Sequence, residues 1–84
     1  MRIELYSRPG CHLCEEAKKV IRAAARSHTF DFVERNVDDD PNWQSEYGHE
    51  IPVILVNGRK AFKYSVSAPA LERYFKREPA NKRR

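Results

Sequence analysis

Apolar residues follow first an alternating and then a helical pattern at the start of the chain. Arg2 to Tyr6 alternates polar and apolar side chains and leads into Ser7-Arg8-Pro9-Gly10, which predicts a short strand followed by a turn. After the turn, apolar side chains recur at spacings of three and four residues. This period predicts a helix of about four turns, from near Cys11 to near Ser27.

A second strand and a short helix are predicted next. The segment from Thr29 to Val37 is rich in β-branched and aromatic side chains, which are typical of strands. A strand, a helix long enough to cross over and another strand form a βαβ unit, whose two strands run parallel. The acidic run 38–40 could bind a cation, but because Pro41 follows it, we expect capping of one or two helical turns over Asn42 to Gly48.

The second half of the chain predicts a hairpin of two strands. Residues 52–56 form a continuous apolar run, as expected of a strand that is buried on both faces. Asn57-Gly58 is a strong signal for a tight hairpin turn. The strand after this turn is predicted from Arg59 to Tyr64.

A final helix and a basic tail complete the predicted organisation. Ser67 can begin a helix that Pro79 ends. The apolar face of this helix is formed by Ala70, Leu71, Tyr74 and Phe75. The predicted order β-α-β-α-β-β-α is that of an α/β chain, and 84 residues fit one domain. We place this domain at residues 1–78 and expect a disordered basic tail at residues 79–84.

The formal net charge of +4 belongs to the end of the chain. The last twelve residues hold six basic side chains and one acidic one, whereas the first 72 hold ten basic and eleven acidic ones. No aromatic side chains interleave with Lys82, Arg83 and Arg84, so we expect no nucleic-acid partner. The chain has neither an apolar run of about 20 residues nor a secretory signal. We therefore expect a cytoplasmic protein without a membrane partner.

The two cysteines form the motif Cys11-His12-Leu13-Cys14 where the first strand gives way to the first helix. In a cytoplasmic chain, a CxxC motif beside a βαβ unit predicts a redox-active pair. Backbone N–H groups and the dipole at a helix N-terminus stabilise a thiolate, which makes Cys11 the expected nucleophile. Cys14, one turn later on the same face, can attack a mixed disulfide at Cys11 and release the reduced substrate.

Charged neighbours act on a Cys11 thiolate in opposite directions. Arg8 and a protonated His12 favour the thiolate, whereas Glu15 and Glu16 in the first helical turn disfavour it. We expect both glutamates to point into solvent, where screening weakens their effect. The helix terminus and Arg8 should therefore prevail.

Two other interpretations of the cysteine pair remain open. The cysteines could be buried and inert, although a helix start is an unusual place for inert core cysteines. They could instead hold zinc or a shared iron-sulfur cluster, in a binding protein rather than an enzyme. Zinc needs four ligands and the motif supplies two. The available histidines, His12, His28 and His49, form no second ligand pair, so we expect no bound metal.

The residues around the cysteines resemble the active-site segment of the glutaredoxin-like branch of the thioredoxin superfamily. The similarity covers residues 6–17, and Ile51-Pro52-Val53 ahead of a buried strand resembles the second signature of that family. In the order of its elements, the resemblance extends over nearly the whole chain, from Met1 to about Arg77. The resemblance implies a thioredoxin-like fold, with a four-stranded mixed sheet and helices on both faces.

The resemblance also implies roles for individual residues. Cys11 would be the nucleophile, Cys14 the resolving cysteine, and Pro52 a cis-proline facing the disulfide. A cis Ile51-Pro52 bond would let the backbone of Ile51 present its polar groups to an extended substrate. The alternative is an ordinary trans proline at the start of a strand. Together with Arg8 and His12, Ile51 and Pro52 are the expected substrate-binding residues.

This chain departs from typical glutaredoxins at several positions. Arg8 stands where they commonly have lysine, and His12-Leu13 replaces a proline and an aromatic residue. Residues 64–68 lack the paired glycine and the acidic residue that hold glutathione, which argues against glutathione as the reductant. We expect a monomeric thiol-disulfide oxidoreductase without a prosthetic group, acting on protein or small-molecule disulfides and recycled by a thiol reductant.

Two histidines and one aromatic pair each have a structural and a functional interpretation. His28 and His49 are expected to be a helix-end cation and a loop residue rather than catalytic groups. Trp43 and Tyr47 could form a substrate lip beside Pro52, but packing of the short helix is the commoner role of such a pair.

Overall fold

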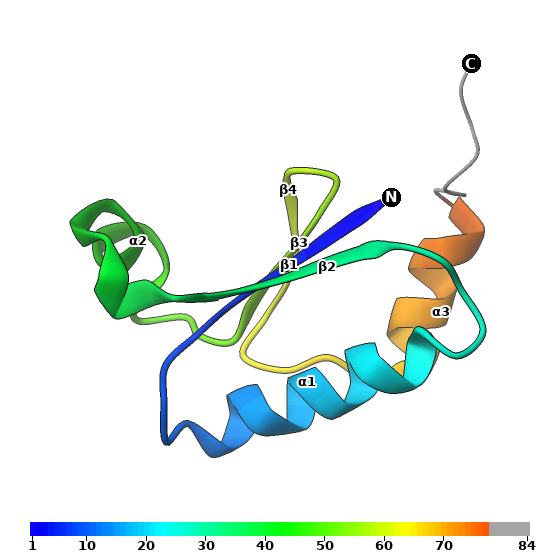
Figure 1. Cartoon of the computed structure of the whole chain (residues 1–84), viewed down its shortest axis with the longest axis horizontal. Helices are drawn as coiled ribbons and strands as arrows, with labels where there is room; N and C mark the ends of the chain where they lie inside the picture. Colours follow the sequence, from blue (N-terminus) through cyan, green and yellow to red (C-terminus); the bar gives the residue numbers. More distant parts are fainter. Residues whose placement is uncertain (78–84) are drawn as a thin grey trace.

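A single sheet of four strands organises the chain. The structure is a computed structural model, and it describes residues 1–77. Along the chain the elements are β1 (Arg2–Ser7), α1 (His12–Ala24), β2 (Asp31–Asn36), a 3-10 helix η1 (Val37–Asp39), α2 (Pro41–Tyr47), β3 (Val53–Val56), β4 (Arg59–Lys63) and α3 (Ala68–Arg77). The predicted order β-α-β-α-β-β-α is confirmed, with η1 as an additional turn (Figure 1).

The sheet is mixed, as predicted, and its strand order is β2-β1-β3-β4. β1 pairs with β2 in parallel, which is what the βαβ unit requires. β3 runs antiparallel to both β1 and β4. Because Tyr6 pairs with Val53 and Val53 pairs with Lys63, the end of β1, the start of β3 and the end of β4 lie at one end of the sheet.

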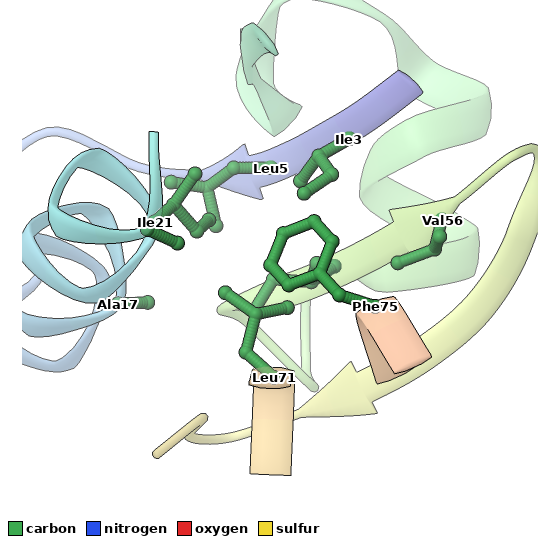
Figure 2. Close-up of a cluster of buried hydrophobic side chains, with 9 residues drawn as sticks. Ile3, Leu5, Ala17, Ile21, Val56, Leu71 and Phe75 are labelled. Atoms are coloured by element: carbon green, nitrogen blue, oxygen red, sulfur yellow. The ribbon is translucent and has the colours of Figure 1, made fainter. Parts of the chain in front are cut away.

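The larger hydrophobic core lies between one face of the sheet and helices α1 and α3. Figure 2 shows Ile3 and Leu5 of β1 beside Ile21 of α1, with Leu71 and Phe75 of α3 closing the cluster. Ile3, Leu5 and Ile21 are completely buried. The spacing of three and four residues along α1 thus places its apolar side chains on the sheet, as the sequence period predicts.

A second, smaller core covers the opposite face of the sheet. It is built from Tyr6, Val37, Val53 and Leu55, with Trp43 and Tyr47 of α2 packed against it. The Tyr6 ring lies 5.5 Å from Trp43 and 4.5 Å from Tyr47, centroid to centroid. Trp43 and Tyr47 therefore pack the short helix, and helices lie on both faces of the sheet.

The predicted hairpin turn is confirmed at Asn57-Gly58. Both residues have positive φ, 52° and 83°, as a type I′ turn requires. β3 itself begins at Val53 rather than Pro52, and its four residues are all buried. β4 ends at Lys63 rather than Tyr64, because Tyr64 adopts a left-handed φ of 72°.

Local capping explains where the other predicted boundaries differ. α1 begins after Cys11 and ends at Ala24, before the predicted end near Ser27. Beyond the helix, the backbone N–H groups of Ser27 and His28 both donate to the Ala24 carbonyl. β2 is shorter than predicted because the Asn36 side chain accepts a hydrogen bond from Asp38 N at 2.9 Å and starts η1. Asp40 caps α2, as expected of the acidic run.

The remaining fold expectations concern the ends of the chain and the membrane. The end of α3 at Pro79 and the disordered tail at residues 79–84 lie outside the described residues. Within residues 1–77, no helix has the length and apolar character needed to cross a bilayer.

Candidate active site

Cys11 is the N-cap residue of α1, which confirms its predicted place at the helix start. It follows a turn in which Cys11 N donates to the Arg8 carbonyl at 3.2 Å, and Gly10 supplies the positive φ of 81° that this turn needs. The Cys11 sulfur accepts a hydrogen bond from Cys14 N at 3.2 Å. An anionic sulfur is stabilised at such a position by the backbone N–H groups and the helix dipole.

Cys14 is buried, with 1% of its surface exposed, whereas Cys11 is partly accessible. Burial raises the pKa of the Cys14 thiol to about 12, and a hydrogen bond with the Cys11 side chain acts in the same direction. The two sulfurs are not joined by a disulfide in this structure. The pair therefore consists of an accessible sulfur at a helix N-terminus and a protonated, inaccessible thiol one turn away.

Arg8 is engaged by a carboxylate that sequence reasoning did not connect to it. Arg8 Nε and Nη2 donate to the two carboxylate oxygens of Asp38, at 3.0 and 3.1 Å. This bidentate bond raises the pKa of Arg8 and lowers the pKa of Asp38. Cys11 and Cys14 are further, weaker causes of the raised Arg8 pKa. The positive charge near the cysteines is thus partly neutralised by Asp38.

His12 and the two glutamates of the first helical turn face solvent. The His12 side chain is 85% exposed and its Nε2 lies 3.9 Å from Glu16 Oε2. Glu15 and Glu16 also pair with Lys18 and Lys19, at 3.5 and 3.6 Å. The expectation that both glutamates point away from the site is confirmed, and His12 lies on the same exposed surface of α1.

A partly buried polar cluster fixes α1 against the sheet next to Cys14. Ser7, at the end of β1, is 6% exposed, and its hydroxyl donates to Glu34 Oε2 at 3.4 Å. Lys18 Nζ lies 2.9 Å from the same carboxylate oxygen of Glu34. Lys18 comes one helical turn after Cys14, so this cluster ties the start of α1 to β1 and β2.

The Ile51-Pro52 peptide bond is cis, as the resemblance implied. Pro52 is fully buried and directly precedes Val53, the partner of Tyr6 on β1. It therefore lies at the end of the sheet from which the loop to Cys11 departs (Figure 1). Neither the N–H nor the carbonyl of Ile51 has a hydrogen-bond partner among residues 1–77.

The structure brings Arg8 and Cys11 together in the turn before α1, with Cys14 in the first turn of the helix. Ile51-Pro52 lies at the same end of the sheet. His28 lies elsewhere, where it bonds Glu72 at 2.8 Å and stacks on Phe75. Sequence reasoning missed Asp38 as the partner of Arg8, because the two are thirty residues apart in the chain. In residues 1–77, no three His, Cys, Asp or Glu side chains gather as metal ligands would.

Comparisons with known proteins agree with this arrangement. A family model described as a glutaredoxin-like domain (DUF836) matches residues 2–76. The glutaredoxin-like protein YDR286C homolog of Dictyostelium discoideum is 27% identical over 77 residues, which span 84% of this chain and 71% of that protein.

Solved structures show the same architecture. The X-ray structure of the target protein XcR50 from X. campestris superposes with a TM-score of 0.74 and 35% identity, covering 92% of this chain and 99% of that one. NrdH-redoxin from Escherichia coli gives a TM-score of 0.65 at 23% identity, over 87% and 93% of the two chains. Thioredoxin 1 from Thermosipho africanus gives 0.62 at 19%, over 98% and 100%. At these lower identities the likeness concerns the fold alone, and that fold is the thioredoxin fold.

Proposed function

The chain belongs to the glutaredoxin-like domain family (DUF836), which supports a redox-type function, and from this premise we propose that it is a small thiol-disulfide oxidoreductase using Cys11 and Cys14. The observation that carries the proposal is the asymmetry of the pair. One sulfur is accessible at the N-cap of α1, and the other is a thiol with 1% exposure. A two-step exchange that ends in an intramolecular disulfide uses this division between an attacking and a resolving sulfur.

The first step is attack by Cys11 on a substrate disulfide. The Cys11 thiolate forms a sulfur-sulfur bond with one substrate sulfur, and the other substrate sulfur leaves as a thiolate that takes a proton from water. The hydrogen bond from Cys14 N and the N-terminus of α1 hold the attacking sulfur. Because its raised pKa of about 12 keeps Cys14 protonated near neutral pH, Cys14 does not compete in this step.

The second step is resolution by Cys14. Its thiol releases a proton to water and its sulfur attacks Cys11 Sγ, which frees the second substrate sulfur and leaves a Cys11-Cys14 disulfide. The cysteine pair has lost two electrons and the Cys14 proton, and the substrate has gained the two electrons. Each freed substrate thiolate takes its proton from water. An external thiol reductant restores the dithiol by the reverse exchange, so no prosthetic group is needed.

Backbone groups next to Pro52 are the proposed contact for the substrate. The unpartnered N–H and carbonyl of Ile51 can pair with an extended segment beside Cys11, as strands pair at an open sheet edge. Arg8 lies nearby, but its charge is shared with Asp38. His12, at the exposed start of α1, is available to a bound substrate.

Single-cysteine variants test which sulfur attacks the substrate and which resolves the mixed disulfide. Cys14→Ser keeps the nucleophile and removes the resolving thiol, so it should accumulate a mixed disulfide with an added disulfide substrate. Cys11→Ser should accumulate none, because its remaining thiol is buried. Intact-mass spectrometry after acid quenching measures both, and Lys19→Ala, at a 76% exposed position of the same helix, serves as a control that keeps both cysteines.

The wild-type protein gives a second readout. Poised between reduced and oxidised dithiothreitol, it should interconvert reversibly between the dithiol and the Cys11-Cys14 disulfide. If no Cys11-Cys14 disulfide formed under oxidising conditions, the result would contradict the proposed function. Visible absorbance or stoichiometric zinc in the purified protein would favour a metal-binding role for the pair instead.

A further inference from the structure

Tyr64 lies directly beside the segment that carries Pro52. Its backbone N–H donates to two carbonyls, those of Pro52 at 2.9 Å and Glu50 at 3.2 Å. These bonds hold the end of β4 against the segment in which Ile51 has unpartnered backbone groups. On the other side of that segment, β1 ends and the loop to Cys11 begins.

Tyr64 also adopts a backbone conformation that its side chain does not favour. Its φ of 72° lies in the left-handed region, where glycine and asparagine are the usual residues. Residues held in such conformations cluster at active sites and ligand contacts. The phenol ring is not folded into either core, and its side chain stays half exposed.

The ring is oriented by a neighbouring cation. Lys63 Nζ lies 5.5 Å from the centre of the Tyr64 ring and 3.4 Å from Glu50 Oε2. Lys60 Nζ bonds the other oxygen of Glu50 at 2.8 Å. The Tyr64 ring is therefore held in place by Lys63, which Glu50 in turn fixes.

Leu13, between the two cysteines in the chain, is a second exposed apolar side chain. Within residues 1–77, Leu13 and Tyr64 are the large hydrophobic side chains that remain exposed, at 52% and 50%. Scattered exposed apolar residues are ordinary. Here one lies between the two cysteines and the other lies beside Pro52. Two neighbouring-strand spacings, about 10 Å, separate the end of β4 from the end of β1, which about three residues of an extended peptide can span.

We infer that Tyr64 is a specificity-determining residue that, with Leu13, contacts apolar side chains flanking the cysteine of a polypeptide disulfide. The inference rests on the proposed oxidoreductase function and names its substrate class. Ile51 lies between the end of β4, where Tyr64 follows, and the end of β1, where the loop to Cys11 begins, so a peptide paired with Ile51 can extend toward both sides. A small hydrophilic disulfide gains nothing from this apolar surface, whereas an apolar-flanked polypeptide buries it during the exchange step.

Two matched peptide disulfides test the inference. Each carries a fluorophore and a quencher on its two halves, and the residues flanking cysteine are Leu and Phe in one version and Ser and Gln in the other. With reduced protein in excess, the wild type should react about three- to tenfold faster with the apolar version. Tyr64→Asn, which tolerates the left-handed backbone, should bring this ratio close to one. Tyr64→Phe, which keeps the ring, should preserve the ratio.

The outcomes separate the two proposals. A wild-type ratio near one, or a Tyr64→Asn ratio equal to that of the wild type, overturns the role of Tyr64 while leaving the oxidoreductase function standing. A wild type that opens neither peptide overturns both. Leu13→Ser provides a second, independent variant and should also lower the ratio, and circular dichroism confirms that each variant is folded.

Discussion

At the scale of single residues, position along one helical turn separates the two cysteines. Cys11 lies before the first helical residue, where its sulfur meets the amide of Cys14. Cys14 lies on the buried face that also carries Ala17 and Ile21. The same helix therefore exposes one sulfur to substrate and withdraws the other from water, and this difference in burial sets the order of the proposed steps.

The raised pKa of Cys14 predicts a pH dependence for the resolution step. Burial, its largest cause, persists in a mixed disulfide, so the Cys14 thiol remains mostly protonated at neutral pH. Its thiolate fraction then increases with pH, and the rate of mixed-disulfide decay should rise about tenfold per pH unit between about pH 7 and 9. Rapid acid quenching followed by mass spectrometry measures that decay. A rate that stays constant over this interval would contradict the prediction.

The Arg8-Asp38 pair predicts a response to substrate charge. Asp38→Asn removes the carboxylate that neutralises Arg8, so a full positive charge then faces substrates near Cys11. The variant should react about threefold faster with a disulfide that carries carboxylates, at low salt, and the gain should shrink at high salt. Arg8→Gln is the matched control and should react more slowly than wild type. Equal rates for all three proteins would exclude electrostatic guidance by Arg8.

At the scale of elements, α1 joins the redox pair to the larger core. Its buried face packs on β1 and α3, and the contact with β2 runs through Lys18 and Glu34. The helix is therefore anchored at both ends, by Ser7 and Glu34 near Cys14 and by His28 on Phe75 after its last turn. Substitutions that weaken this core should therefore destabilise α1, the helix whose first turn carries Cys11 and Cys14.

Truncation of Ile21 tests this anchoring. Ile21 is completely buried among Leu5, Leu71 and Phe75 (Figure 2), so Ile21→Ala should lower the free energy of unfolding by about 2–5 kcal/mol. Urea denaturation of the reduced protein measures the loss. Lys19→Ala, at a 76% exposed position of the same helix, should change the free energy of unfolding by less than about 0.5 kcal/mol. If both substitutions had equal effects, the core would not carry the stability of α1.

At the scale of the whole molecule, the end of the sheet that holds Cys11 is also the end that holds Pro52 and Tyr64. The mixed topology produces this arrangement, since β1 points toward it, β3 departs from it and β4 returns to it. Each of these three strands therefore leads to or from one part of the candidate site. The opposite end contains the Asn57-Gly58 turn and the start of β1.

A complete site within one chain predicts a monomer. Light scattering should give a mass near 9.9 kDa for both the reduced and the oxidised protein. A shared iron-sulfur cluster would instead join two chains and double the mass, with visible absorbance that disappears on chelation. The two measurements on anaerobically purified protein thus separate the oxidoreductase from the metal-binding alternative.

Much of this architecture could be predicted from the sequence because its signals are local. Hydrophobic period, the Asn57-Gly58 turn and the capping residues each depend on neighbours in the chain, and they gave the correct order of elements. The cis bond before Pro52 came from family resemblance rather than from any local signal. The placement of Cys11 and Cys14 followed from their position at the helix start.

The features that escaped prediction depend on contacts between distant segments. Arg8 and Asp38 meet only after β1 and β2 pair in parallel and bring their following turns together. Tyr64 was predicted to extend β4, and no residue type signals its left-handed backbone or its amide bonds to the Pro52 segment. Such contacts form only once the sheet has folded, and the spacing of residues along the chain does not predict them.

The hairpin turn at Asn57-Gly58 offers a place to modify the protein without touching its chemistry. β3 has four residues, so this turn lies about 15 Å along the sheet from the Pro52 end. Both turn residues are exposed, so an insertion between them meets solvent, whereas a side chain at Gly58 itself would be strained by its φ of 83°. A label or a short loop inserted at this turn should therefore leave the exchange chemistry of Cys11 and Cys14 unchanged, because the turn lies at the other end of the sheet.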